Sequence, residues 1–278
     1  MFNVRQAVIL AAGVGSRLKG TLDDRPKGFI KLGERAIIEE SIAKLIHANI
    51  TDIVIVTGYC PEFYERLSEK FAVIRTIWNP DFAGSGSMRS FCVASPYINS
   101  DFLLLESDLS YEYKALQTLQ SSSLGSCILL SGETGSGDEV YVGISGQRVV
   151  NMSKKRSDIT CLGGELVGIS KISQELYRRM INICPKKCKH NRQYHYEDCL
   201  TDISDDIAIR YHYIEDLAWT EIDDENQLTR AQEKIYPLIK QRDSGITVAK
   251  KGNRYVLLNT GHTATTDTVT QVTFDKAI

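Results

Sequence analysis

Short apolar runs alternate with segments of helical periodicity through the first two-thirds of the chain. An apolar run without polar alternation is typical of a strand buried on both faces, as in a parallel sheet. Strands followed by helix-period segments are the sequence form of βαβ units, so we predict an α/β fold. The predicted strands are residues 7–10, 53–57, 72–78 and 102–106, and the predicted helices are residues 37–46, 61–70 and 87–94.

In the predicted helix over 37–46, Ile38 and Ile42 lie on the apolar face and Lys44 on the solvent side.

The later part of the chain has a less regular pattern. The glycine-rich segment 132–138, GETGSGD, could bind phosphate, but we expect a solvated connection. Further strands are predicted over residues 127–131, 139–144, 148–152, 162–170, 207–214 and 217–221, and helices over residues 172–184, 196–203 and 224–241.

The residues after the first strand predict a phosphate site. Gly13 and Gly15 make a turn with few side chains, which lets backbone N–H groups approach a phosphate, and Arg17 and Lys27 add positive charge. The turn lacks the third glycine of the dinucleotide fingerprint and the Gly-Lys-Ser/Thr of a Walker A loop. A turn that needs glycine only for its geometry is the alternative.

Three more candidate segments follow predicted strands: Gly58-Tyr59, the loop over 84–87, and Asp108. Ligands of open α/β sheets bind outside the carboxyl ends of the strands. We therefore expect these segments and the glycine turn to lie together.

Composition excludes several classes of function. The chain has 278 residues, 42% hydrophobic and 24% charged, which is typical of a globular protein, and its formal charge of −2 gives no reason to expect a nucleic-acid partner. We expect no membrane segment or signal peptide. Seven cysteines without framework spacing favour a reducing cytoplasm. Zinc is not expected, because Cys184, Cys188, His190 and His195 lack paired C-x₂-C spacing.

Several of these residues together resemble a known superfamily. LAAGVGSRL, then Pro26-Lys27 and FIKLGERAIIEESI, resembles the N-terminal signature of nucleotidyltransferases with a GT-A-like fold. Asp108 and the segment EIDDENQL agree with this, so the resemblance covers residues 5–240. It implies a Rossmann-like mixed, mostly parallel sheet flanked by helices.

Within that superfamily, the chain is most similar to cytidylyltransferases that act on small phospho-amines. VTGY, Asn79, a small-residue loop that ends at Ser90, and Asp108 carry this likeness. The family often has asparagines where this chain has the Gly-Ser-Gly-Ser of residues 84–87, which leaves its base contacts open.

The C-terminal segment YVLLNTGHTATTDTVTQ resembles the start of the pyridoxal-phosphate (PLP) transaminases that act on 2-aminoethylphosphonate, although His262 replaces their usual proline. We therefore expect a cytidylyltransferase domain over residues 1–243, and over 244–278 a linker with the beginning of a transaminase-like part. A fused or partner transaminase would use the PLP and form the amine. The resemblance thus implies transfer of a cytidylyl group from CTP to 2-aminoethylphosphonate.

This reaction brings two anions together, so it needs positioning and cations more than covalent chemistry. We expect Arg17 to bind the leaving phosphates and Lys27 to span the α-phosphate and the attacking oxygen. Mg²⁺ takes oxygen ligands and keeps several waters, so Asp108 and Asp223 suffice, with Glu221 as the alternate. A dianionic acid is already a nucleophile near neutral pH, so no general base is expected.

The contacts with the amine, the phosphonate and the nucleotide base are expected at the positions that match the cytidylyltransferase family. A primary ammonium offers three donors to carboxylates, whereas a quaternary ammonium favours an aromatic cage. We therefore expect Glu197 and Asp198, beside Tyr196, to hold the amine, and Lys154 or Lys155 to hold the phosphonate. The nucleotide-binding candidates are Leu10, Ala11, Ala12, Gly13, Gly15, Ser16, Tyr59, Gly84, Ser85 and Ser87.

Plainer structural roles stay open for these residues. Asp108 and Asp223 could cap helices, the pair at 197–198 could mark a helix start, residues 84–87 could be turn chemistry, and the lysines could be a solvated charge run. Alternative functions are a phosphocholine cytidylyltransferase, a sugar-1-phosphate nucleotidylyltransferase and a non-catalytic nucleotide-binding regulator. A GT-A glycosyltransferase fits less well, because Ser107-Asp108 is not an Asp-x-Asp pair.

Overall fold

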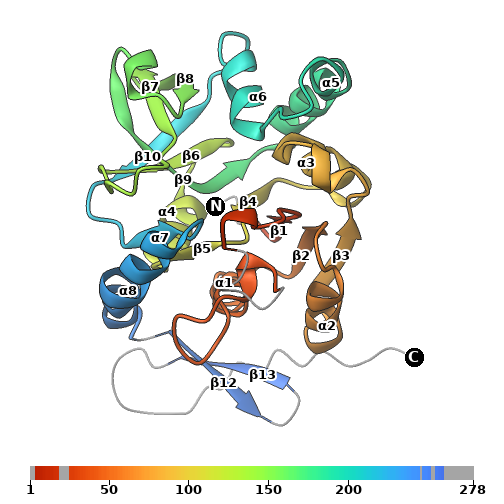
Figure 1. Cartoon of the computed structure of the whole chain (residues 1–278), viewed down its shortest axis with the longest axis vertical. Coiled ribbons are helices and arrows are strands. Elements are labelled where there is room, and N and C mark those ends of the chain that lie inside the picture. The colour runs from red at the N-terminus through yellow and green to blue at the C-terminus, as the bar shows by residue number, and fades with distance from the viewer. Residues whose placement is uncertain (1–3, 19–24, 245, 252–253, 260–278) are drawn as a thin grey trace.

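A computed structural model describes residues 4–18, 25–244, 246–251 and 254–259. A nine-stranded mixed sheet runs in the order β10-β6-β9-β4-β1-β2-β3, and β7 and β8 branch from β9 (Figure 1). Its strands are β1 (Gln6–Ala11), β2 (Asp52–Thr57), β3 (Ile74–Trp78), β4 (Phe102–Glu106), β6 (Cys127–Ser131), β7 (Tyr141–Ser145), β8 (Arg148–Ser153), β9 (Leu162–Ile172) and β10 (Arg210–Ile214).

Four neighbouring strands, β4, β1, β2 and β3, are parallel. All residues of β1 are buried, because strands cover both of its edges and helices both of its faces. Leu10 pairs with Glu106, and Ala11 pairs with Thr57. The carboxyl ends of these strands are therefore neighbours, which confirms that the segments after them lie at one edge of the sheet.

Helices cover both faces of this sheet. The helices are α1 (Ile37–His47), α2 (Glu62–Lys70), α3 (Ser87–Val93), α4 (Lys114–Ser121), α5 (Gln174–His190), α6 (Tyr196–Ile203), α7 (Glu225–Arg230) and α8 (Tyr236–Arg242). One core contains Ile9 and packs against α1, α2 and α4, and the other contains Val8 and packs against α3, α5 and α6. Figure 1 shows α3, α5 and α6 above β1, and α1 and α2 below it. The predicted α/β fold is confirmed.

Lys44 is a correction to the predicted pattern. It lies in α1 as expected, but only 7% of its surface is exposed. Its ammonium donates to the carbonyl of Tyr111 and lies 2.9 Å from the Asp243 carboxylate. Asp243 directly follows α8 and supplies the buried charge partner that lets a lysine lie inside.

Other elements differ from the predictions at their ends. The helix predicted over 172–184 begins only at Gln174, because β9 extends to Ile172 and the Ser173 hydroxyl caps the helix, and it continues to His190. The helix predicted over 224–241 is divided into α7, a π-helical segment (Ala231–Ile235) and α8. The sequence did not predict α4, nor the strand β5 (Leu109–Tyr111), which pairs with β11 (Trp219–Glu221).

The C-terminal part contains a hairpin of β12 (Ile246–Lys251) and β13 (Arg254–Asn259), and β12 lies against α1. Of the transaminase-like segment, only residues 255–259 are among the described residues; the rest of it, with His262, lies outside them. The division at residue 243 stays a prediction.

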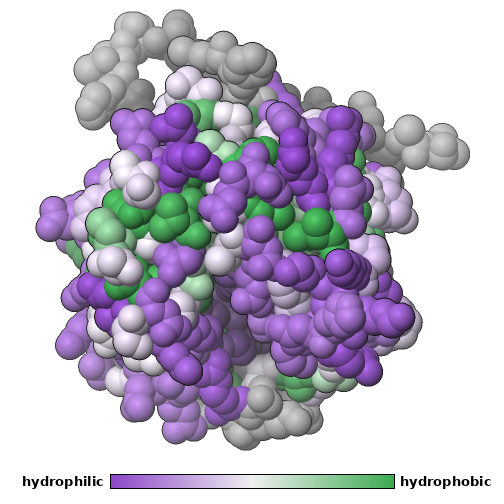
Figure 2. All heavy atoms as spheres, turned by 90° about the horizontal axis from the view of Figure 1, so that it is seen from above, coloured by the Kyte–Doolittle hydropathy of each residue, from purple (hydrophilic) through white to green (hydrophobic). Residues whose placement is uncertain are grey.

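The face of the molecule in Figure 2 is mainly hydrophilic. On the face in Figure 2, hydrophobic side chains form separate patches among hydrophilic ones, around a central recess. No described helix combines the length and the apolar character that crossing a membrane requires. A disulfide joins Cys92 on α3 to Cys184 on α5, and the other five cysteines are free thiols.

Candidate active site

The turn after β1 brings a glycine against a lysine. Gly15 has a φ of 63°, a conformation that favours glycine, and it precedes a 3₁₀ turn at Ser16–Leu18. A Cβ on Gly15 would lie 3.0 Å from Cγ of Lys27, so glycine leaves room for this side chain. The turn thus places Arg17 and Lys27 on the same side of the sheet edge. The side chain of Ser16 is outside the described atoms.

Lys27 lies between two carboxylates. Its Nζ is 2.9 Å from Oδ2 of Asp108 and also contacts Oδ1 of Asp223. Burial lowers the pKa of Lys27, but the two carboxylates outweigh burial and hold this pKa above its ordinary value. Lys27 is therefore a fixed positive charge at the carboxyl end of β1.

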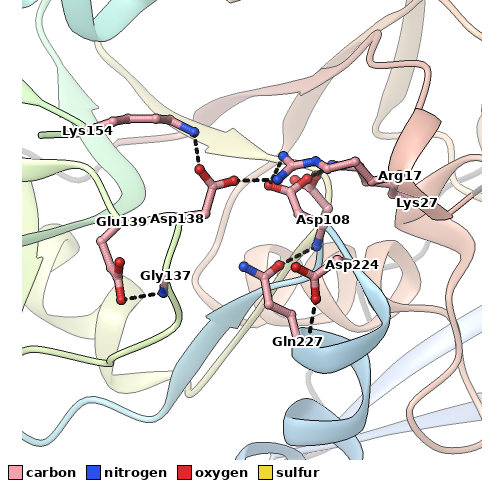
Figure 3. A network of polar contacts seen from close by, with 10 residues as sticks. Arg17, Lys27, Asp108, Gly137, Asp138, Glu139, Lys154, Asp224 and Gln227 are labelled. Atoms are coloured by element: carbon pink, nitrogen blue, oxygen red, sulfur yellow. Dashed lines mark hydrogen bonds and ion pairs between the residues drawn. The ribbon is translucent and has the colours of Figure 1, made fainter.

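Arg17 joins the same network from the side on which Lys27 lies, and Lys154 reaches it from the other side (Figure 3). Its Nη2 is 2.8 Å from Oδ2 of Asp223, and its Nη1 is 2.8 Å from Oδ2 of Asp138. The other oxygen of Asp138 lies 2.8 Å from Nζ of Lys154. The segment 132–138 thus ends in a carboxylate that binds both Arg17 and Lys154. The prediction of a solvated connection did not include this role.

A cluster of carboxylates lies beside Lys27. Single oxygens of Glu106, Asp108 and Glu221 are all within 4.8 Å of one another, which makes this the one group of three or more potential metal ligands found among the described residues. Burial and the neighbouring acids raise the pKa of Glu106 to about 8 and also raise the pKa of Glu221. Three carboxylates that offer hard oxygen donors fit Mg²⁺ or a similar cation.

The proposed metal ligands do not act as helix caps. Asp108 is followed by the strand β5, and the side chain that caps α7 belongs to Asp224, which accepts from the backbone N–H of Gln227 at 2.8 Å. Asp223 instead receives Lys27 and Arg17, and only 3% of its surface is exposed. Neither Asp108 nor Asp223 therefore caps a helix through its side chain.

Two adjoining hollows meet at this network. The smaller, about 200 Å³, is lined by Lys27, Asp108 and Phe82, and also by five of the expected nucleotide-binding residues, which are Leu10, Ala12, Gly13, Ser85 and Ser87. Ala11, Tyr59 and Gly84 are not part of its lining. Ala11 is buried in β1, and the Tyr59 N–H donates to the carbonyl of Ala12 at 3.4 Å.

The larger hollow, about 600 Å³, is lined by Arg17, Lys154, Glu197, Asp198 and Asp223. It shares Ser87, Glu106 and His195 with the smaller one. The network of Lys27 and Asp223 lies between the two, since Lys27 lines the smaller hollow and Asp223 the larger. The site therefore has room for two ligands that meet at Lys27.

The residues expected to hold an amine take three different positions. Glu197 lines the larger hollow, its Oε2 is buried without a hydrogen-bond partner, and burial raises its pKa to about 7. Asp198 also lines the hollow, but its Oδ2 accepts from the backbone N–H of His195 at 2.8 Å and so marks the start of α6. Tyr196 is buried outside the lining, and its hydroxyl donates to Glu106 at 2.7 Å.

Sequence reasoning missed several residues of this site. Glu106 is the last residue of a predicted strand, and its position at the carboxyl end was the signal for it. Trp219 and Arg230 carry no local motif and reach the larger hollow only through the fold, and Asp138 ends the glycine-rich segment that was expected to be a solvated connection. Lys155 does not line this hollow, and Cys184 is bonded to Cys92.

Comparisons with known proteins bear on the family and the fold of the chain. Residues 7–134 match the MobA-like NTP transferase domain, which confirms the resemblance to nucleotidyltransferases. The chain is 30% identical to a choline-phosphate cytidylyltransferase of Streptococcus pneumoniae, over 36% of this chain and 43% of that protein. It is 24% identical to a 2-aminoethylphosphonate cytidylyltransferase of Lancefieldella rimae, over 78% of this chain and 87% of that protein.

A third relative is a CMP-5'-(3-aminopropyl)phosphonate synthase of Streptomyces rubellomurinus, 30% identical over 45% of this chain and 20% of its own length. The matches to this synthase and to the choline-phosphate enzyme span less than half of either protein. Two solved structures share the fold. One is the inositol-1-phosphate CTP transferase from T. maritima, with a TM-score of 0.75 and 19% identity over 88% of this chain and 98% of that one. The other is the CTP:phosphocholine cytidylyltransferase from Streptococcus pneumoniae, with a TM-score of 0.67 and 18% identity over 84% of this chain and 99% of that one.

Proposed function

We propose that this chain transfers the cytidylyl group of CTP to 2-aminoethylphosphonate, giving CMP-aminoethylphosphonate and pyrophosphate. The observation that carries the proposal is the Lys27 network between two hollows. The smaller hollow would hold the nucleoside and the larger one the acceptor. The N-terminal match to an NTP transferase domain and the cytidylyltransferases among the relatives support this assignment.

The chemistry requires attack by a phosphonate oxygen on the α-phosphorus of CTP, with loss of pyrophosphate. Lys27 would neutralise charge on the α-phosphate and the attacking oxygen, because its ammonium lies where the hollows meet. Arg17 would bind the leaving phosphates, supported by N–H groups of the turn at Gly13 and Gly15. Lys154 would hold the phosphonate. The nucleophile is already an anion, so no residue is needed to remove a proton from it.

A divalent cation fits the carboxylate cluster. Asp108 belongs to this cluster, and Glu221 is the alternate ligand within it. Asp223 is outside the cluster but binds the same Lys27 as Asp108, so Asp108 and Asp223 would hold Mg²⁺ through hard oxygen donors. When bound, the ion would add positive charge for the phosphates.

The larger hollow favours a primary amine over a trimethylammonium group. Trp219 is the one phenylalanine, tyrosine or tryptophan in its described lining, so it lacks the several rings of an aromatic cage. Glu197 instead offers a buried carboxylate oxygen without a partner. A carboxylate can accept from the three donors of a primary ammonium. The C-terminal likeness to transaminases of 2-aminoethylphosphonate supports the same substrate, with a fused or partner transaminase, which would carry the PLP, as its source.

The proposal is tested by pyrophosphate release with CTP and magnesium chloride, comparing 2-aminoethylphosphonate, phosphocholine and glucose 1-phosphate as acceptors. We expect the highest kcat/KM with 2-aminoethylphosphonate, and no release when EDTA replaces magnesium. Release with phosphocholine or glucose 1-phosphate at a higher kcat/KM would reassign the acceptor. Absence of release with both phospho-amines would refute the proposal.

A further inference from the structure

We propose that Asp138 is a positioning residue that holds Arg17 and Lys154 before the substrates bind and competes with the phosphates of the nucleotide for Arg17. This inference rests on the proposed function, since it concerns how CTP and the acceptor enter the same site. Asp138 itself is not expected to contact the reacting atoms.

The geometry brings two cations to the Asp138 carboxylate, Arg17 from 121 positions away in the sequence and Lys154 from 16 positions away (Figure 3). Oδ2 of Asp138 is 2.8 Å from Nη1 of Arg17, in the turn after β1, and its Oδ1 is 2.8 Å from Nζ of Lys154, just after β8. The side chain of Asp138 is 22% exposed, whereas those of Arg17 and Lys154 are 53% and 62% exposed. One partly shielded carboxylate thus restrains two flexible cations on the wall of the larger hollow.

The segment that carries Asp138 is held in place by other contacts. The buried Glu139 accepts from the backbone N–H of Gly137 at 2.9 Å. The N–H of Thr134 donates to Glu165 at 2.8 Å, and its carbonyl accepts from Arg230 at 3.0 Å. None of these contacts uses the Asp138 carboxylate, so removal of its charge should leave the segment folded.

Each Nη atom of Arg17 binds one carboxylate, so a triphosphate that binds either Nη atom competes with Asp138 or Asp223. Asp223 is the less mobile of the two, because its side chain is 4% exposed and also binds Lys27. Asp138 binds Arg17 from a loop and is more exposed. Displacement of Asp138 is therefore the easier step, and the same carboxylate can keep Lys154 in position for the acceptor.

This arrangement predicts effects of opposite sign for one substitution. In Asp138→Asn, CTP no longer competes with a carboxylate for Arg17, so its Kd should fall about fivefold, the size of one charge contact. Lys154 loses its restraint, so the acceptor KM should rise by about the same factor while kcat changes less. A damaged fold would weaken both ligands instead.

The test measures CTP binding by calorimetry without acceptor, and acceptor KM by pyrophosphate release. Glu133→Gln is the matched control, because Glu133 is an exposed acid in the same segment. We expect it to leave both constants unchanged. Lys154→Gln, which keeps Asp138, should raise the acceptor KM without tightening CTP.

The outcomes separate the two proposals. If the unmodified protein binds no CTP, the proposed function fails. If the unmodified protein binds CTP, the two variants are compared. The positioning role is refuted if the CTP Kd of Asp138→Asn equals that of Glu133→Gln, or if the acceptor KM values of these two variants are equal. Weaker CTP binding in Asp138→Asn would refute it as well.

Discussion

The Lys27 ammonium lies 2.9 Å from the carboxylate of Asp108, a residue 81 positions away in the sequence. The same ammonium contacts Asp223, which is 196 positions from Lys27 in the sequence. The 3₁₀ segment Lys27–Phe29, the residues after β4 and the residues after β11 therefore meet at one lysine. This convergence makes Lys27 the residue whose loss should affect the chemistry most.

Lys27→Ala should lower kcat by about 100-fold or more, because it removes a preorganised cation from the reaction centre. The matched control is Lys31→Ala, since Lys31 is an exposed lysine close by in the sequence. Turnover by pyrophosphate release and far-ultraviolet circular dichroism measure activity and fold. Near-normal turnover in a folded Lys27→Ala protein would remove Lys27 from the reaction centre.

Acceptor binding should depend on the ionisation of Glu197. Burial raises its pKa to about 7, so the free protein carries this side chain mostly neutral below that pH and charged above it. A carboxylate attracts an ammonium group, so the acceptor KM should fall as the pH rises from 6 to 8, the range around this pKa. The phosphonate also titrates near this range.

Glu197→Gln separates the two ionisations, because the phosphonate still titrates in the variant. We expect a higher acceptor KM at pH 8, and a shallower dependence of KM on pH than in the unmodified protein. An identical pH profile in the variant would exclude Glu197 from amine binding.

Much of the fold follows from local sequence, and much of the site does not. Strands β1, β2 and β4 were predictable because a strand buried on both faces has a nearly unbroken apolar run. Asp108 was predictable because it follows such a strand, and Lys27 because Pro26-Lys27 is part of the nucleotidyltransferase-like signature. The position of Lys44 was not, since a helical pattern assigns lysine to the surface, and its partner Asp243 comes from the far end of the main body. Asp138 was missed for the same reason, because its partners are fixed only by the tertiary fold.

The buried pair of Lys44 and Asp243 should contribute to stability and not to catalysis. Lys44→Met leaves the Asp243 carboxylate, 10% exposed, without its cation, which should lower the free energy of unfolding by about 3 kcal/mol. The exposed pair of Lys70 and Glu39 is the control, and Lys70→Met should cost less than about 1 kcal/mol. Urea unfolding measures both. Equal effects of the two substitutions would contradict a structural role for the buried pair.

Gly86 should be required for the shape of the smaller hollow. A Cβ at this position would lie 2.4 Å from the carbonyl oxygen of Tyr194, and the Gly86 N–H donates to the carbonyl of Arg192 at 2.7 Å. Gly86→Ala should separate these two segments and weaken CTP binding about tenfold, or 1.4 kcal/mol. Gly125→Ala is the control, since its nearest atom would be 4.0 Å away. Unchanged CTP affinity in Gly86→Ala would show that the nucleoside does not occupy this hollow.

The most direct test of the account is ³¹P NMR of a reaction that contains the chain, CTP, 2-aminoethylphosphonate and magnesium chloride. Transfer of the cytidylyl group forms a phosphonate–phosphate anhydride, so the phosphonate and α-phosphate resonances should become coupled doublets that grow together with pyrophosphate. The Lys27→Ala protein should give this product at a rate lower by about two orders of magnitude. Pyrophosphate without the coupled doublets, or an unchanged phosphonate resonance, would contradict cytidylyl transfer to 2-aminoethylphosphonate.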